Sequence, residues 1–312
     1  MANLKKLKEK ISSFSKTAKV TKAMESISAI KMRKAQQEAV EARFYSFKVF
    51  GILKRLSHIV GENVDSIFAN SIPDDGRVAI LLITPDKGLT GGMNTFLNKK
   101  VLEVVKENNF SKDNLDFICV GKKGYEFLER NNFSIIKYFD QINEKSDLKV
   151  VSEVSDYVSD LYKNKVGEYK KIFSIYTEFI NTSEQKAVSK IILPVVFDNV
   201  KDFVKTIKPN KGKYSNLKNI EIDDKDVPAY IFEPNIETVL HNLIPYILNI
   251  EVYYSLLESF ASEHSARMVA MKNATEKAEE KAEDSRKKFN RQRQAKITQE
   301  ISEIVSGMES MK

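Results

Sequence analysis

Cysteine, histidine and long apolar stretches are all scarce in this chain of 312 residues. The single cysteine, Cys119, excludes an internal disulfide, and its apolar surroundings are typical of a core strand rather than a reactive thiol. The three histidines are scattered, without the clustering that metal ligands need. No apolar run approaches the ~18 residues of a membrane-spanning helix, and the amino-terminal segment lacks the apolar core of a secretory signal. We therefore expect no cofactor, no metal site and no transmembrane segment.

Proline and glycine are absent from both ends of the chain. Residues 1–50 and 246–306 contain neither of them. Both stretches far exceed the usual helix of ~11–12 residues. At ~1.5 Å rise per residue, the second could reach roughly 90 Å. A domain of ordinary size cannot surround such a helix, so we expect the two ends to pair as an antiparallel rod.

Heptad spacing supports this pairing, because apolar residues seven apart are typical of coiled coils. In the carboxyl-terminal segment the spacing predicts a seam that repeats every seven residues through Ile250, Leu257, His264, Met271, Ala278, Ser285 and Gln292. Between these positions, the same seam includes Tyr254, Ala261 and Met268. In the amino-terminal segment, steps of three and four link Leu4, Leu7, Ile11, Phe14 and Ala18. Beyond Ala18 the apolar residues predict that the seam continues with a small phase shift, through Val20, Met24 and Ile27.

Between the rods, apolar runs alternate with helical patterns. The runs predict strands at 78–84, 117–120 and 135–139, and the spacing predicts helices at 94–106, near 125–128 and at 148–162. Alternating strands and helices imply a parallel sheet with crossover helices. Two further runs with no helix between them, 171–180 and 186–196, predict a hairpin.

The predicted fold class is therefore α/β, with a long antiparallel coiled coil of the terminal helices plus a Rossmann-like domain. The expected boundaries are 1–60 for the first coiled-coil helix, 75–233 for the globular domain and 234–312 for the second helix. Within the domain, the polar stretch 209–226 predicts a loop or insertion, and 228–233 predicts a last strand.

A glycine-rich segment, PDKGLTGGMN at residues 85–94, separates the first strand from the helix that follows. Backbone amides at such a place can hold phosphate. The segment has neither the GxxxxGK[ST] nor the GxGxxG spacing of nucleotide-binding loops. A tight strand-to-helix turn is the preferred interpretation, and an enzyme that uses this turn to bind a nucleotide is the alternative.

Basic residues are concentrated on the two rods, in a chain with a net charge of +7. One cluster spans 31–34, and a larger one, interleaved with amide side chains, spans 286–296. Guanidinium and amide groups suit recognition of carboxylates and carbonyls, which favours an acidic protein partner. Nucleic acid is the rival partner, but aromatic residues are nearly absent among these charges and no known binding motif accompanies them.

Several of these segments are similar to those of a known family. The strings VTKAME at 20–25 and KMRKAQ at 31–36 resemble the gamma subunit of F-type ATP synthase. So do DKGLTGGMN at 86–94, ASEHSARMVAMKNA at 261–274 and NRQRQAKITQEISEIVSG at 290–307. The matching segments occur in the family's order and cover both rods and the first strand–turn–helix unit.

The resemblance implies a rotor shaft, not an enzyme, because the catalytic residues of such motors belong to the beta subunits. The coiled coil would pass through a ring of alpha and beta subunits. The globular domain would stand on the c-ring beside epsilon, as a peripheral protein at the cytoplasmic face of a bacterial membrane. By resemblance, Arg293, Gln294 and Thr298 contact a loop of beta, whereas Lys22, Met24 and Arg267 lie near its acidic lever segments. A paralogous F1-like ATPase that drives another process, such as surface motility, is the alternative.

Overall fold

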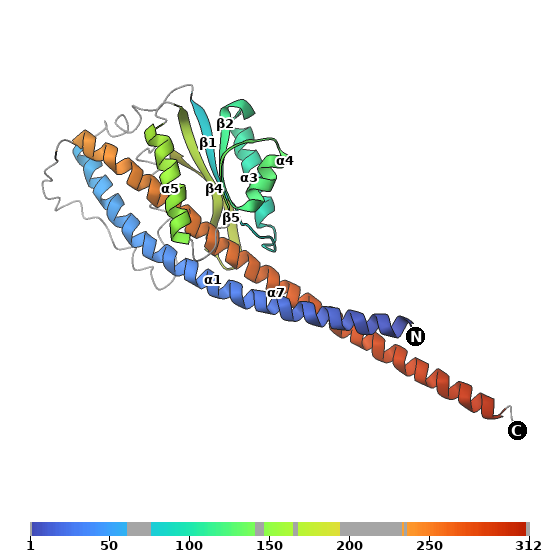
Figure 1. Ribbon diagram of the computed structural model, residues 1–312. Helices are drawn as coiled ribbons and strands as arrows, with labels where there is room; N and C mark the ends of the chain where they lie inside the picture. Colours follow the sequence, from blue (N-terminus) through green and yellow to red (C-terminus); the bar gives the residue numbers. More distant parts are fainter. Residues whose placement is uncertain are drawn as a thin grey trace.

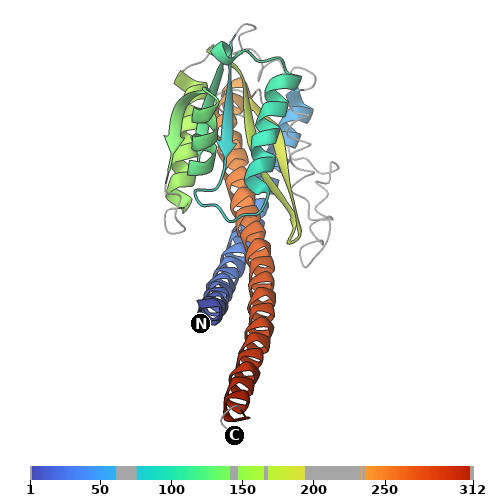
Figure 2. The same ribbon diagram turned by 90° about the vertical axis from the view of Figure 1, so that its right-hand side faces the viewer.

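Two helices of unequal length dominate the molecule. A computed structural model of the chain describes residues 2–60, 76–140, 147–164, 168–193, 233 and 236–309. The helices α1 (Ala2–Val60) and α7 (Ile236–Glu309) run side by side in opposite directions (Figure 1). The α/β domain sits toward one end of this rod, and both chain termini lie at the other (Figures 1 and 2). Of the helices in the described ranges, none has the length and apolarity needed to cross a bilayer.

The domain is built on one five-stranded sheet with the order β3-β2-β1-β4-β5. Strands β1 to β4 are parallel, and β5 is antiparallel to β4. This arrangement confirms the predicted parallel sheet and the predicted hairpin. The strands are β1 (Arg77–Ile83), β2 (Leu115–Val120), β3 (Ser134–Phe139), β4 (Tyr169–Asn181) and β5 (Glu184–Leu193). Residues 194–196, the predicted loop at 209–226 and all but residue 233 of the last predicted strand lie outside the described residues.

Helices cover both faces of the sheet. Helices α3 (Met93–Glu107) and α4 (Lys122–Arg130) lie on one face, whereas α5 (Asp147–Asn164) and α7 cover the other (Figure 1). In β1, β2 and β4, alternate residues enter the two cores, because successive side chains of a strand point to opposite faces. Cys119 is fully buried on the α3 side, and burial raises the pKa of its thiol to about 12. Its predicted role as a core strand residue is confirmed.

The longest helix, α7, belongs to both the domain and the rod. Near its start, Ile247, Leu248 and Val252 pack into the core of the domain. Further along, the Ser262 hydroxyl donates to the backbone carbonyl of Thr177 at 3.0 Å, and the Ser265 hydroxyl donates to that of Thr182 at 2.9 Å. The β4–β5 hairpin is therefore attached directly to the shaft.

Candidate partner-binding surface

The seam of the rod determines which side chains remain available on its surface. On α1, the residues turned toward α7 follow an unbroken alternation of three and four, through Leu4, Leu7, Ile11, Phe14, Ala18, Thr21, Glu25, Ser28, Met32 and Ala35. The predicted phase shift is wrong, since Val20 and Ile27 are 60% and 53% exposed. Thr21 and Ser28 occupy the seam instead, because their hydroxyls find partners. Thr21 Oγ1 lies 2.7 Å from Thr275 Oγ1 across the seam, and the Ser28 hydroxyl donates to the Met24 carbonyl.

On α7, the predicted heptad positions are buried or half-buried from Ile250 through Ser285, which confirms that part of the seam. Gln292 was expected to continue it and is exposed. The Thr21–Thr275 pair fixes the register and places Gln292 level with Leu4, in the first turn of α1. There the two helices diverge and little of α1 remains to cover α7 (Figure 2). The seam therefore ends before Gln292.

Beyond this point α7 continues alone. Ala2 lies nineteen residues before Thr21, so it is level with Gln294, nineteen residues after Thr275. Past Gln294, α7 extends to Glu309 without α1 beside it (Figures 1 and 2). This overhang exposes an apolar stripe with 47–68% of each side chain accessible, made of Ile297, Ile301, Ile304, Val305 and Met308. Such a stripe is typical of an interaction surface. Sequence reasoning missed it, although its steps of three and four were readable.

The predicted contact residues Arg293, Gln294 and Thr298 lie at the base of the overhang. All of them are exposed. None makes a side-chain hydrogen bond or ion pair within the part of the chain that the structure describes. Their polar groups are therefore available to a partner, next to the apolar stripe. We refer to Arg293, Gln294, Thr298 and the stripe together as the tip surface.

A second surface lies on α1, nearer the domain. Lys22 is exposed, and its ammonium forms an ion pair with the Glu25 carboxylate at 3.1 Å. Met24 is half-buried, and Val20 and Ile27 flank it as exposed apolar side chains. Val20, Met24 and Ile27 share one flank of α1, whereas Lys22 points to the opposite flank, because residues two apart on a helix do not share a face. We refer to Val20, Lys22, Met24 and Ile27 as the collar surface.

Arg267, which sequence reasoning grouped with Lys22 and Met24, is engaged inside the molecule. Its side chain is only 11% exposed and forms an ion pair with the Glu263 carboxylate at 2.6 Å. The same guanidinium group donates to the backbone carbonyls of Lys87 and Gly88 at 3.3 and 3.4 Å. Burial raises the pKa of Glu263, and the Arg267 charge opposes this shift. Arg267 therefore attaches the glycine-rich turn to the shaft.

The collar and tip surfaces are separate sites. Lys22 is level with Ala274, one residue before Thr275 on α7. Arg293 follows nineteen residues later, which corresponds to about 28 Å along a helix. One compact ligand cannot reach both, but a partner that encloses the rod can.

The glycine-rich segment forms the expected tight turn between β1 and α3. Gly91 adopts a φ of 57°, a conformation that glycine accepts without steric cost. Leu89 also has a positive φ, 65°, and its side chain is 59% exposed. Across the described residues, no cluster of three or more histidine, cysteine, aspartate and glutamate residues is placed to hold a metal ion.

Comparisons with known proteins agree with this architecture. A family model described as ATP synthase matches residues 3–311. The ATP synthase gamma chain of Cytophaga hutchinsonii is 34% identical over 314 residues, covering 100% of this chain and 99% of the relative. The chain belongs to the ATP synthase gamma-chain family. The gamma chain of Geotalea daltonii is also 34% identical, over 312 residues and 100% of both chains.

Solved structures share the gamma-chain fold. A chain of the Euglena gracilis mitochondrial ATP synthase, from a structure of OSCP, F1 and c-ring, matches with a TM-score of 0.61. It is 17% identical, and the match covers 99% of this chain and 95% of that one. A central-stalk and c-ring structure of the Tetrahymena thermophila enzyme matches with a TM-score of 0.55 at 22% identity, covering 82% of this chain and 99% of that one. These likenesses establish that the gamma-chain fold, with its paired helices and α/β domain, is present here.

Proposed function

We propose that this chain is the central rotor shaft of an F-type ATP synthase. It couples rotation of an ion-driven c-ring in the membrane to conformational change in a ring of alpha and beta subunits. Full-length similarity to gamma chains supports this proposal most directly. The rod adds a physical reason, because it reaches well beyond the domain and ends in a single helix that exposes apolar side chains.

In this proposal the tip surface turns inside the upper part of the alpha–beta ring. An exposed apolar stripe on a lone helix is stabilised when a partner covers it, at about 25 cal/mol per Å² of apolar area. Arg293, Gln294 and Thr298 then contact a loop of beta through groups that have no partner among the described residues. A charged hydrogen bond there contributes roughly 1.5–3 kcal/mol.

The collar surface faces the acidic lever segments of beta. Lys22 supplies positive charge on one flank of α1, and Val20, Met24 and Ile27 supply apolar contact on the other. Arg267 acts differently from a free basic group, because its charge is already paired with Glu263. Its contribution to the motor is to attach the glycine-rich turn to α7, so that the turn and the shaft move together. The α/β domain contacts epsilon and the c-ring, at the cytoplasmic face of the membrane.

The chain carries no catalytic role in this proposal, since the ATP-hydrolysing sites belong to the beta subunits. The pure chain is therefore expected to turn over no ATP. Activity that persists through successive purification steps, and that a substitution in the glycine-rich turn abolishes, would contradict the assignment and favour an enzyme that uses this turn.

Capture of the chain from detergent-extracted native membranes tests the function. We expect alpha, beta, epsilon and c subunits to copurify in one complex. Recovery of alpha- and beta-like subunits without any c-ring would favour a paralogous motor that drives another process. Membranes from cells in which the chain carries no capture tag provide the control.

A further inference from the structure

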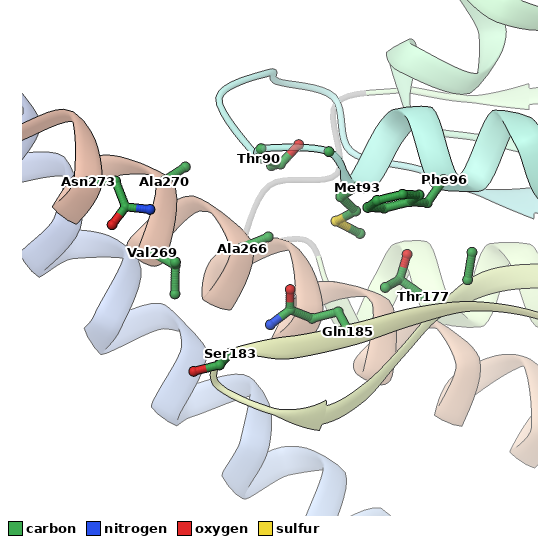
Figure 3. Close-up of a pocket in the computed structure, with 13 residues that line it drawn as sticks. Thr90, Met93, Phe96, Thr177, Ser183, Gln185, Ala266, Val269, Ala270 and Asn273 are labelled. Atoms are coloured by element: carbon green, nitrogen blue, oxygen red, sulfur yellow. The ribbon is translucent and has the colours of Figure 1, made fainter.

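A cavity of about 210 Å³ lies where the domain meets the shaft. Its walls come from the glycine-rich turn, the start of α3, the β4–β5 hairpin and α7 (Figure 3). The thirteen residues that line it include no charged side chain. Neither the shaft function nor the collar and tip surfaces use this cavity.

The position of the cavity in the sheet is the one where open α/β folds bind ligands. From β1 the chain continues to β2 and β3 on one side, whereas β4 adds on the other side. The carboxyl ends of β1 and β4 therefore border a crevice at which the strand order reverses. Ligands of doubly wound sheets bind in this crevice. Here the turn after β1 and Thr177 near the end of β4 both line the cavity.

One end of the cavity is suited to negative charge. Helix α3 has fifteen residues, and Gly92 at its amino terminus provides no side-chain cap. The Met93 amide donates to the Thr90 carbonyl at 3.3 Å, but the amino-terminal end of such a helix still carries a partial positive charge that attracts anions. The lining has no carboxylate that would repel an anion.

Thr177 is an independent indication of a ligand site. Its side chain is 2% exposed, and its hydroxyl oxygen has no hydrogen-bond partner among the described residues. In Figure 3 this hydroxyl points toward the wall that Met93 and Phe96 form at the start of α3. Burial of an unpaired hydroxyl is costly, so a ligand oxygen placed between Thr177 and α3 would be favoured.

The rest of the cavity is apolar. Met93 and Phe96 lie on the α3 side, and Ala266, Val269 and Ala270 form the wall that belongs to the shaft (Figure 3). Phe96 is 61% exposed although it is large and apolar. A compact apolar body lying against these side chains would be removed from water together with them.

We propose that this cavity binds a small organic oxyanion, a carboxylate or a phosphate ester on a short apolar body. The oxyanion lies at the amino terminus of α3 within reach of the Thr177 hydroxyl, and the apolar body lies between Phe96 and the Ala266–Ala270 wall. Such a ligand contacts the α/β domain and the shaft at once, so its occupancy strengthens the junction between them. The proposal does not depend on the rotor function, because the full chain alone contains the whole cavity.

Titration of the full chain with hexanoate tests the proposal. The methyl group of Met93, labelled with carbon-13, reports binding by NMR, and Met308 on the overhang serves as the internal reference. For a ligand of this size we expect a dissociation constant of about 1 mM. Neutral hexanamide should bind roughly tenfold more weakly, because it lacks the charge that α3 attracts. Titration with butyl phosphate shows whether the cavity prefers a phosphate ester or a carboxylate. Tighter binding of either butyl phosphate or hexanoate supports the proposal.

Two variants locate the ligand. Thr177→Val removes the hydroxyl at nearly constant volume and should weaken hexanoate binding roughly five- to tenfold. Ala270→Leu fills the cavity from the shaft and should abolish the Met93 shift, whereas Thr298→Val on the overhang should bind like wild type. Thermal melting checks that each variant folds. If Thr177→Val does not fold, the loss of hexanoate binding in Ala270→Leu still tests whether the ligand lies in the cavity.

Several results would overturn the proposal. Equal affinity for hexanoate and hexanamide would exclude an anion site. Inorganic phosphate that binds as tightly as the organic anions would exclude a role for the apolar body. Absence of any Met93 shift, or wild-type affinity in Ala270→Leu, would exclude the cavity.

Discussion

Asp116, a single carboxylate, connects the amino ends of four strands. Its oxygens accept bonds of 2.6 and 2.7 Å from Arg77 on β1, 2.7 Å from Ser134 on β3 and 3.1 Å from Tyr169 on β4. Burial would raise the pKa of Asp116, but the hydrogen bonds from Arg77 and Ser134 outweigh it and lower that pKa below its ordinary value of 3.8. The ionised carboxylate therefore stabilises the fold.

Asp116→Asn should lower the free energy of unfolding at pH 7 by about 1–3 kcal/mol, because it weakens several bonds to a buried group. A lowered pKa means that the carboxylate's contribution is present above the unfolded value and is lost as pH falls through the folded value. The difference between Asp116→Asn and wild type should therefore shrink below pH 3.8. Urea unfolding at pH 7 and at acidic pH measures this, with Asp113→Asn as the control. A difference that stays constant into acid would contradict the assignment.

Glu251, on α7, shows the opposite behaviour. It is buried, and burial raises the pKa of its carboxyl from 4.5 to about 8, although the positive charge of Lys190 opposes the shift. The folded state therefore holds a proton that the unfolded state releases above pH 4.5, so stability should fall as pH rises from 4.5 to about 8.

Glu251→Gln keeps the shape of the side chain and removes this titration. We expect the variant to melt above wild type at pH 8 and close to it at pH 5. A stability gain of 1 kcal/mol corresponds to roughly 2–4 °C in a domain of about 150–250 residues and to a smaller shift in a longer chain such as this one. Thermal melts across this range provide the measurement. An equal offset at both pH values would show that the carboxyl is not protonated in the folded state.

The pair of long helices depends on a seam with few large apolar residues. Met271 is 4% exposed within it. Met271→Asp should destabilise the chain by about 3–5 kcal/mol, because it buries an unpaired charge. Met268 is half-buried, so Met268→Asp should cost less. Lys272→Asp places the same group on the exposed side and serves as the control in thermal unfolding and in assembly with alpha and beta subunits. An unchanged melting temperature in Met271→Asp would disprove the seam assignment.

The sequence predicted the helices and strands well, because their periodicities are local. The prediction failed where the helical repeat, rather than the hydrophobicity of the side chains, determined which residues of α1 face α7. The apolar residues Val20 and Ile27 suggested a phase shift, whereas the helix repeat brought Thr21 and Ser28 into the seam. The end of the seam before Gln292 depends on where α1 stops, which no local pattern encodes.

The surface residues were only partly predictable. Arg293 and Gln294 lie on the outside, as neighbours beyond the seam should. The partners of Arg267 were not foreseeable, because the Lys87 and Gly88 carbonyls lie about 180 positions away in the chain. Only the folded domain brings the turn to the shaft.

At the scale of the whole molecule, we predict that the tip surface is needed for the activity of the assembled motor. Replacing both Arg293 and Gln294 with Ala should lower ATPase activity or torque after reconstitution with alpha and beta subunits. The melting temperature of the free chain should not change, since neither side chain bonds to a described residue. Steady-state hydrolysis and single-molecule rotation are the measurements, and Lys99→Ala on the α/β domain is the control. Wild-type rate and torque would place the contact elsewhere on the shaft.

The unequal lengths of α1 and α7 also have a mechanical consequence. The rod tapers from two helices to one beyond Gln294. A lone helix twists and bends more readily than a pair joined along a seam, so elastic deformation under load concentrates in the last turns of α7. The thick part, where hydrogen bonds join the β4–β5 hairpin to α7, deforms least. The end formed by α7 alone can therefore bend to fit the partner that surrounds it. The end formed by both helices, which is attached to the domain, transmits the torque.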